Sequence, residues 1–324
     1  MAEIALAQAV NSALKEEMLL DERVYILGES IRGGAFGVTT GLFQELGPDR
    51  VMDTPISETA IAGSCVGAAL AGYRPVADMM IMDFFSPCHT EVCKMAAWWG
   101  YTHNRDGGMK LPIVYMSVMG GYTMWGPEHT GADLAFFKHT PGLKIVVPTT
   151  AYDAKGLLKM AIRDDNPVVY LIHALLLGVK GEVPDEDYTI PFGKAVIRRE
   201  GRDATVVATG YMVSLAMQAA EQLAARGISL EVIDPRTIEP FDLETVLSSA
   251  KKTGRVVLVD EDKKVCSITA EIGMRIVEEA FYYLKAPVQR VGAEHVPLGT
   301  RTLEQASLPS VDKIVAAVEA ALKD

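Results

Sequence analysis

The chain has 324 residues, of which 49% are hydrophobic and only 7% aromatic, and its net charge is −11. This length allows two domains with a core each. The acidic balance, without a basic stripe, argues against a nucleic acid or a membrane as a main partner. The longest uncharged stretches, 111–127 and 204–220, are shorter than the roughly 20 residues of a spanning helix, and the first contains proline and glycine. We expect a soluble, cytoplasmic protein whose four cysteines, none in a CxxC pair, are reduced.

Strands and helices alternate through the first half of the chain. Residues 4–20 have apolar side chains at helical spacing and predict an amphipathic helix. A short buried strand at 24–27 precedes a glycine-rich loop at 33–37. The alternation continues with strands at 51–53, 76–84, 113–118, 145–147 and 168–172, and with helices at 40–46, 61–73, 91–99 and 153–163. Because the strands are almost entirely apolar, this pattern predicts a parallel sheet covered by helices on both faces.

A polar segment that contains proline separates two such halves. We predict a first domain at 1–180, a linker at 181–192 and a second domain at 193–324. In the second domain the alternation restarts, with strands at 205–208, 229–233, 256–259 and 288–291, and helices at 214–226, 243–250, 270–284 and 310–322. The expected fold class is therefore α/β, with two doubly wound domains.

One segment between a strand and a helix of small residues could carry chemistry. In Asp53-Thr54-Pro55-Ile56-Ser57-Glu58, Ser57 can cap the helix and place Glu58 in its first turn, where the helix dipole favours a carboxylate. An ordinary helix start has the same pattern. However, α/β proteins bind ligands at the carboxyl ends of parallel strands, so this position also suits a ligand.

Two further positions allow a functional or an ordinary explanation. His129 lies in the glycine-containing loop 126–131, where it can be an acid–base group or a solvated side chain. The helix end at 161–167 brings backbone carbonyls close to Asp and Asn oxygens, which could hold a hard cation or form a common turn. The motifs GxxxxGK[ST], GxSxG and HExxH are absent, and the early glycines do not match the dinucleotide fingerprint.

Taken together, the segments resemble the β subunits of heterotetrameric 2-oxo acid dehydrogenase E1 components, with the acetoin and pyruvate types most similar. The resemblance covers nearly the whole chain, and the order and spacing of the matching stretches make it specific. These stretches are 27–29, 33–36, 50–58, 74–76, 83–85, 141–144, 153–157, 161–167, 190–195, 234–237 and 252–255. The resemblance implies a pyrimidine-binding domain followed by a transketolase C-terminal-type domain.

The family also implies a shared cofactor and several partners. Thiamine diphosphate would lie between this chain and an E1 α subunit in an α2β2 heterotetramer, and a lipoyl-bearing E2 core would accept the acyl group. In the family the α subunit holds the diphosphate and Mg²⁺ through a GDG…N motif. No GDG sequence occurs in this chain, so we expect the α subunit to supply that half of the site.

The resemblance assigns a role to several residues. Glu58 matches the glutamate that hydrogen-bonds the aminopyrimidine N1′ and so favours the tautomer that deprotonates the thiazolium ring. Phe84 resembles the residue that packs on the aminopyrimidine, Ile56 lies beside it, and Glu29 is expected to line the same pocket. His129 matches a histidine implicated in passing the acyl group to a lipoyl arm. A structural K⁺ site is implied at Ile113, Ala161, Ile162, Asp164 and Asn166.

The chain departs from the family pattern around the substrate channel. The family usually has Asp-Gln where this chain has Thr90-Glu91, and His-Ser-Gln where it has His129-Thr130-Gly131. These departures put the substrate and the lipoyl acceptor in question but leave the cofactor-activating glutamate in place. Two alternatives to an E1 subunit remain open, a split two-chain transketolase-like enzyme and a non-catalytic homologue.

Overall fold

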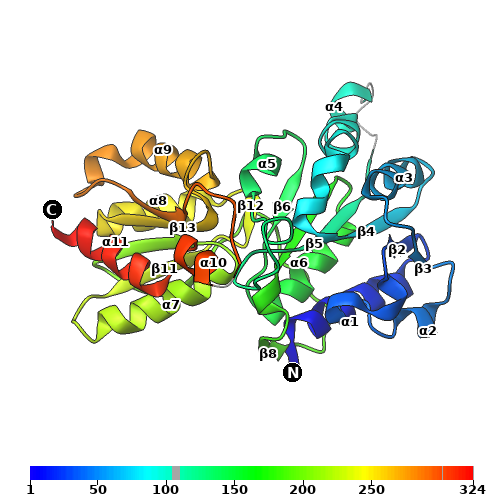
Figure 1. Ribbon diagram of the computed structural model, residues 1–324, viewed down its shortest axis with the longest axis horizontal. Helices are drawn as coiled ribbons and strands as arrows, with labels where there is room; N and C mark the ends of the chain where they lie inside the picture. The colour runs from blue at the N-terminus through cyan, green and yellow to red at the C-terminus, as the bar shows by residue number, and fades with distance from the viewer. Residues whose placement is uncertain (104–109, 301, 324) are drawn as a thin grey trace. The chain divides into compact units, whose positions relative to one another are not determined.

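The computed structural model describes residues 1–103, 110–300 and 302–323, which form two compact units (Figure 1). The first unit contains Met1–Met119 and Phe136–Phe192, and the second contains Gly120–Ala135 and Gly193–Asp324. The segment Gly120–Ala135 thus leaves the first unit in mid-chain and packs with the second, which sequence periodicity did not indicate.

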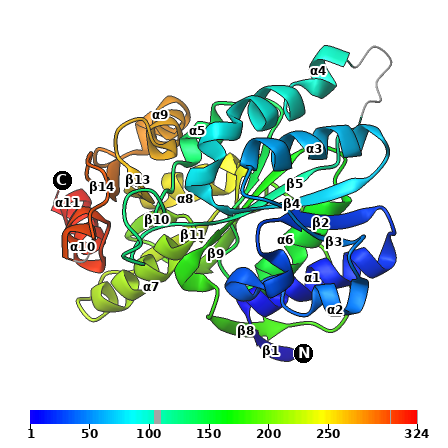
Figure 2. The ribbon, with the colours of Figure 1, turned by 45° about the vertical axis from the view of Figure 1, so that its right-hand side comes forward.

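The first unit is built on a parallel sheet in which six of its strands follow the order β6-β7-β5-β4-β2-β3. Their apolar side chains are buried because helices lie on both faces, with α3 on one side and α1 and α6 on the other (Figure 2). The strands are β2 (Val24–Gly28), β3 (Val51–Asp53), β4 (Arg74–Ile81), β5 (Val114–Met119), β6 (Lys144–Val146) and β7 (Val168–His173). The helices are α1 (Leu6–Leu20), α2 (Leu42–Leu46), α3 (Glu58–Leu70), α4 (Trp99–His103), α5 (Leu134–Lys138) and α6 (Ala151–Arg163).

Three predicted elements of this unit differ from their observed form. The strand predicted at 76–84 ends at Ile81, and a 3₁₀ helix, η3 (Met82–Cys88), follows it. The helix predicted at 91–99 is a π-helix, η4 (Thr90–Ala96), whose wider turns leave no mark on hydrophobic periodicity. The start of the predicted helix at 4–20 is instead strand β1 (Ala2–Ala5).

Strand β1 pairs in antiparallel fashion with β8 (Lys180–Val183), which occupies the start of the predicted linker. The remaining residues up to Phe192 also belong to the first unit, because Asp187 accepts hydrogen bonds from Arg163 and the Tyr188 ring stacks on Tyr152. This segment resembles a linker in composition because its side chains are polar, but those side chains bind the surface of the first unit.

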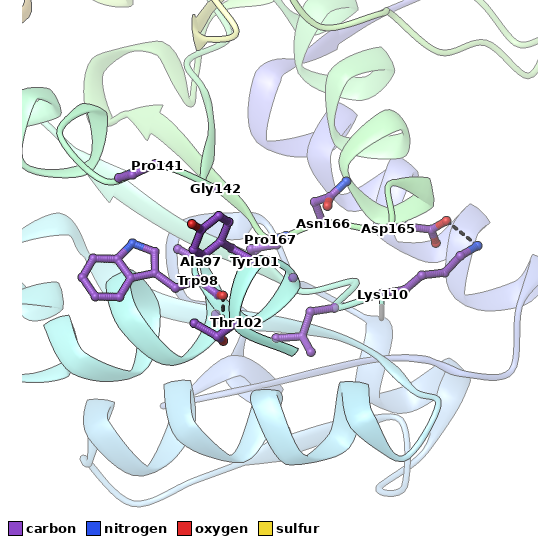
Figure 3. A pocket seen from close by; sticks show the side chains of 13 residues that line it. Ala97, Trp98, Tyr101, Thr102, Lys110, Pro141, Gly142, Asp165, Asn166 and Pro167 are labelled. Atoms are coloured by element: carbon purple, nitrogen blue, oxygen red, sulfur yellow. Dashed lines mark hydrogen bonds and ion pairs between the residues drawn. The ribbon is translucent and has the colours of Figure 1, made fainter. Parts of the chain in front are cut away.

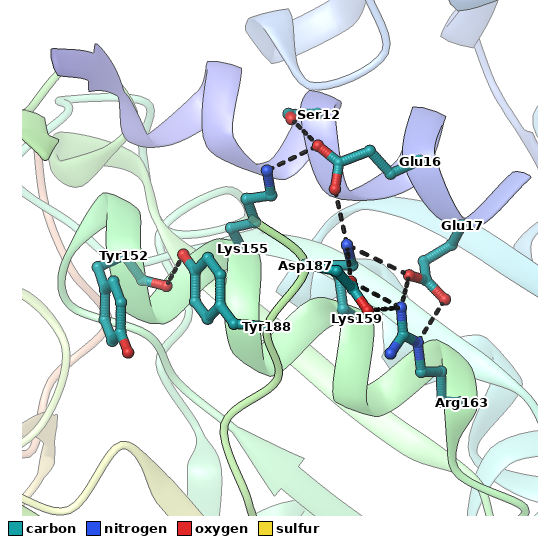
Figure 4. Close-up of polar contacts among 9 residues, drawn as sticks. All are labelled: Ser12, Glu16, Glu17, Tyr152, Lys155, Lys159, Arg163, Asp187 and Tyr188. Atoms are coloured by element: carbon teal, nitrogen blue, oxygen red, sulfur yellow. Dashed lines mark hydrogen bonds and ion pairs between the residues drawn. The ribbon is translucent and has the colours of Figure 1, made fainter. Parts of the chain in front are cut away.

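Charged side chains join α1 to α6 and to the 184–192 segment (Figure 4). Glu16 accepts from Lys155 and Lys159 at 2.6 Å each, and Glu17 accepts two hydrogen bonds from Arg163 at 2.7 and 2.9 Å. Lys159 also pairs with Asp187. Lys159 and Glu17 are 2% and 3% exposed, so these charges depend on one another for solvation.

The second unit has its own mixed sheet in the order β14-β13-β10-β11-β9, in which only β9 is antiparallel to its neighbour among the described pairs. Its core joins the sheet to α7 and α11 through small and branched side chains. The strands are β9 (Val196–Arg199), β10 (Ala204–Ala208), β11 (Leu230–Asp234), β12 (Thr237–Glu239), β13 (Val256–Lys263) and β14 (Gln289–Ala293). The helices are α7 (Tyr211–Ala224), α8 (Leu243–Thr253), α9 (Ile268–Ala280), α10 (Thr302–Ser307) and α11 (Val311–Lys323).

Both units therefore have the α/β architecture that the sequence predicts. No helix in the described ranges combines the length and apolar character needed to cross a bilayer.

Candidate active site

The carboxyl edge of the first sheet gathers four of the predicted site residues. Glu29 follows β2, Ile56 and Glu58 follow β3, and Phe84 lies on η3 after β4. Strands β4, β2 and β3 are neighbours in the sheet. Where β2 and β3 end, the Thr54 amide donates to the Gly28 carbonyl at 3.0 Å. Parallel neighbours end at the same edge, so the fold brings all four residues to one side of the sheet.

Glu58 is the first residue of α3 and is partly buried. Ser57 occupies the N-cap position as predicted, but its side chain makes no capping hydrogen bond. The helix start is instead attached to η3, since the Thr59 hydroxyl donates to the Pro87 carbonyl at 3.2 Å. Unpaired amides of the first turn still face this end of the helix and favour a carboxylate there.

A second acid lies near Glu58. Burial, followed by the charges of Glu91 and Glu58, raises the pKa of the Cys88 thiol to about 12. Glu91, one of the departures from the family pattern, lies on the π-helix against α3, and its Oε2 is buried without a hydrogen-bond partner among the described residues. The sequence shows Glu91 as an ordinary acid of an amphipathic helix, and only the packing on Gly63 places it here.

The surroundings of Glu58 suit an aromatic ring that has a basic nitrogen. Phe84 is half-buried and can offer a ring face, whereas Ile56 is 72% exposed although it is apolar. A carboxylate at a helix start, an aromatic ring and an uncovered aliphatic side chain together match a heteroaromatic group that needs one polar partner and two apolar ones. The residues present therefore fit the pyrimidine half of thiamine diphosphate.

His129 belongs to the second unit. It lies in a turn where its amide donates to the Gly126 carbonyl at 3.1 Å, and its side chain is partly exposed. The next residue, Thr130, is buried and its hydroxyl donates to the same carbonyl at 2.9 Å. In this chain Thr130 therefore closes the turn, and its hydroxyl is not free to meet a substrate.

The residues of the predicted K⁺ site lie near the end of α6, where two cationic side chains from β4 and β6 already contact the loop. Arg74 donates to the carbonyls of Ile162 and Asp164 at 2.9 and 2.6 Å, and Lys144 pairs with the Asp164 carboxylate. Asn166 donates its side-chain amide to Asp164. The carbonyls of Ala161 and Ile113 accept from backbone amides. The K⁺ site stays a prediction, and the arginine and lysine supply positive charge to the same oxygens.

A cavity of about 750 Å³ opens beside this loop (Figure 3). Trp98 and Tyr101 line it, with Lys110 paired to Asp165 at 2.7 Å on its far side. Gly142 forms part of the wall, where its φ of 98° and its close approach to the Ala97 carbonyl leave no room for a Cβ atom. Among the described residues, Glu29, Ile56, Glu58 and Phe84 do not line this cavity, so it is separate from the candidate site.

Fold and site together define a transketolase-type α/β protein. Residues 2–179 match the transketolase pyrimidine-binding domain family, and residues 193–314 match the transketolase C-terminal domain family. A solved structure described as a split-gene transketolase, an inactive β4 tetramer, has a TM-score of 0.82 and 25% identity and covers 99% of each chain.

Relatives of known function narrow this class. The chain is 43% identical to the 2-oxoisovalerate dehydrogenase subunit beta of Bacillus subtilis, over 98% of each chain. It is 40% identical to the acetoin:2,6-dichlorophenolindophenol oxidoreductase subunit beta of Cupriavidus necator, over 99% of this chain and 98% of the relative. It is 43% identical to the pyruvate dehydrogenase E1 component subunit beta of Rhizobium meliloti, over 99% of this chain and 70% of the relative.

The chain belongs to the family of E1 β subunits of 2-oxo acid and acetoin dehydrogenases. The family and the two-domain fold class predicted from the sequence are thereby confirmed. Membership implies the use of thiamine diphosphate and an α subunit as partner.

Proposed function

We propose that this chain is the β subunit of an α2β2 E1 component that decarboxylates a small 2-oxo acid or cleaves acetoin and passes the acyl group to a lipoyl carrier. The observation that carries the proposal is the position of Glu58, a carboxylate in the first turn of α3 at the carboxyl edge of the sheet, with Phe84 and Ile56 at the same edge. The named substrates of the relatives, 2-oxoisovalerate, acetoin and pyruvate, define the substrate class.

Thiamine diphosphate, when bound, supplies a nucleophilic carbon and an electron sink. Glu58 would hold a proton between its carboxylate and a ring nitrogen of the pyrimidine, and so control the basicity of the amino group on that ring. Glutamine at this position would keep the shape of the side chain but could not exchange the proton. Phe84 and Ile56 would hold the ring between apolar surfaces and exclude water, while Glu29 would face it from the end of β2.

The diphosphate and Mg²⁺ would be bound by the α subunit, because this chain contains no GDG sequence. His129 would act at the acyl-transfer step, where an imidazole can donate a proton to the lipoyl sulfur. The split-transketolase alternative rests on likeness of fold, whereas the E1 assignment rests on 40–43% identity over nearly the whole chain.

Co-expression with a GDG-containing α subunit, followed by calorimetric titration with thiamine diphosphate and Mg²⁺, tests the shared site. We expect tight binding by the complex and none by this chain alone. Cofactor binding by the isolated chain, or an assembled complex that binds no cofactor, would contradict the proposal.

Glu58→Gln in the assembled complex tests the chemistry. Because positioned acid–base groups contribute about 10²- to 10⁴-fold to rates, we expect turnover to fall at least about 100-fold with little change in cofactor-free assembly. Glu244→Gln is the matched control, since Glu244 is an exposed acid in the first turn of α8. Full activity of the Glu58 variant would overturn the assignment.

A further inference from the structure

The loop that carries His129 has an unfavourable backbone. Within 120–131, Tyr122 and Met124 have φ angles of 63° and 60°, in the left-handed region that residues with a side chain seldom adopt. Such conformations persist only where the surrounding structure holds them. The groups that hold this loop therefore decide where His129 lies.

Two buried glutamates of the second unit accept hydrogen bonds from the loop backbone. The Gly121 amide donates to Glu261, at the end of β13, and the Met124 amide donates to Glu304, on α10, at 2.9 Å. The two side chains are only 4% and 0% exposed. A Cβ atom at Gly121 would lie 3.1 Å from Glu304 and 3.3 Å from Glu261, which shows how closely both carboxylates approach the loop.

A third contact and the loop's own hydrogen bonds complete the attachment. The Tyr122 hydroxyl donates to the Pro309 carbonyl at 2.8 Å, and its ring packs against Tyr211. The Gly120 amide donates to the Gly131 carbonyl at 2.9 Å and closes the base of the loop. Since the His129 amide binds within this closed loop, its position follows from the backbone on which the glutamates act.

We propose that Glu261 and Glu304 are positioning residues that set the place of His129 for acyl transfer. This inference rests on the proposed function of His129. A buried carboxylate is expensive to desolvate, and an apolar side chain would fill the same space more favourably. What these side chains add, and an apolar side chain lacks, is an acceptor oxygen for a backbone amide of the loop.

The first test measures hydrogen exchange of the 120–131 amides in the full chain, without cofactor. We expect Glu304→Ala to speed exchange of this segment at least about fivefold, because the Met124 amide loses its acceptor. Glu304→Gln keeps an acceptor oxygen and should restore most of the protection. Glu278→Ala, at an exposed glutamate on α9, is the matched control and should leave the segment unchanged.

The second test separates two activities of the assembled complex. Oxidation of substrate by a dye does not require transfer to a lipoyl domain, whereas reductive acylation of a lipoyl domain does. We expect Glu304→Ala to lower acylation about tenfold and dye reduction less than about twofold, with rescue by glutamine. In a His129→Ala background the same change should have no further effect on acylation, because it acts through that side chain.

Each outcome bears on one proposal only. Unchanged exchange in Glu304→Ala, or unchanged acylation where His129→Ala lowers it, would overturn the positioning role. A wild-type complex that carries out neither reaction would overturn the proposed function, while hydrogen exchange would still decide whether the glutamates hold the loop. If Glu304→Ala does not fold, Glu261→Ala, which removes the acceptor of the Gly121 amide, gives the same exchange test.

Discussion

Two regions, one in each unit, treat buried charge in opposite ways. Between α1 and α6 of the first unit, every buried cation and anion of the cluster formed by Glu16, Glu17, Lys155, Lys159 and Arg163 has an opposite charge as its partner. At the end of β13 in the second unit, Asp260, Glu261 and Asp262 are consecutive and all buried. Their described partners are mainly backbone amides and a hydroxyl.

The pKa values follow this difference. Burial acts to lower the pKa of Lys159, but the Asp187 and Glu16 carboxylates outweigh it and hold that pKa above its ordinary value. In the second unit burial dominates and raises the pKa of Asp260 to about 7. Burial, with the nearby charges of Asp260 and Asp133, also raises the pKa of Asp262 well above its usual range.

The comparison separates two uses of charge. Paired charges attach α1 to α6 and stabilise the first unit, provided that no partner is removed. Burial of Asp260 and Asp262 at the end of β13 opposes folding of the second unit at neutral pH, while Glu261 beside them binds the His129 loop. A side chain that binds a backbone amide must offer an acceptor oxygen, and a cation paired with that oxygen would compete with the amide.

The largest expected effect is in the paired cluster. Lys159→Met should lower the free energy of unfolding by about 3 kcal/mol, because it removes a buried cation that contacts Glu16, Glu17 and Asp187 and leaves Lys155 and Arg163 to compensate their charge. Chemical denaturation of the isolated chain measures this. The exposed Lys323→Met, on α11, is the control. A loss below about 1 kcal/mol would show that the remaining cations suffice, and the contrast between the units would then disappear.

The next effect is a pH dependence from the second unit. The folded-state pKa of Asp260 lies above its unfolded value, so the stability linked to its proton is present below about pH 4 and is lost as pH rises through about 7. Between pH 5 and 7, wild type should lose at most about 2.7 kcal/mol relative to Asp260→Asn, at up to about 1.4 kcal/mol per pH unit. Thermal unfolding of both proteins over this range measures the difference. Parallel curves would show that Asp260 is charged throughout.

A buried acid with a cationic partner also occurs in the second unit and allows a direct comparison with the Lys159 cluster. Glu231 on β11 is fully buried and accepts from Ser249 and from Lys252, whose side chain is 43% exposed. Lys252→Met should lower the free energy of unfolding by about 1–2 kcal/mol, less than Lys159→Met, because water can reach this end of the pair. A loss as large as that of Lys159→Met would indicate that burial of the acid alone determines the effect.

The smallest effect is expected at an exposed pair. Arg226, which lies just after α7, donates to Glu319 on α11 at 2.5 Å, and both side chains are exposed. Arg226→Ala should change the free energy of unfolding by less than about 1 kcal/mol, and the change should shrink in high salt. A larger, salt-insensitive loss would point to packing of the arginine stem.

The local sequence pattern alone determined most strands and helices of this protein and the position of Glu58. The apolar strands at 24–27 and 168–172, alternating with amphipathic helices, predict the parallel sheet correctly, because strand and helix periods depend on neighbouring residues. The position of Glu58 between a strand and a helix of small residues also placed it correctly at the carboxyl edge. Full-length resemblance then identified the family, which composition and hydrophobic periodicity do not.

Other features depended on contacts between distant residues and were decided only by the tertiary structure. Nothing local distinguishes Gly120–Ala135 from any other loop, and it joins the second unit because Glu261 and Glu304, more than a hundred residues later, bind its backbone. The residues after Lys180 have the composition of a linker but pair with β1 at the opposite end of the first unit's sequence. Period and capping act over a few residues, whereas hydrogen-bond partners of this kind are chosen only once the chain has folded.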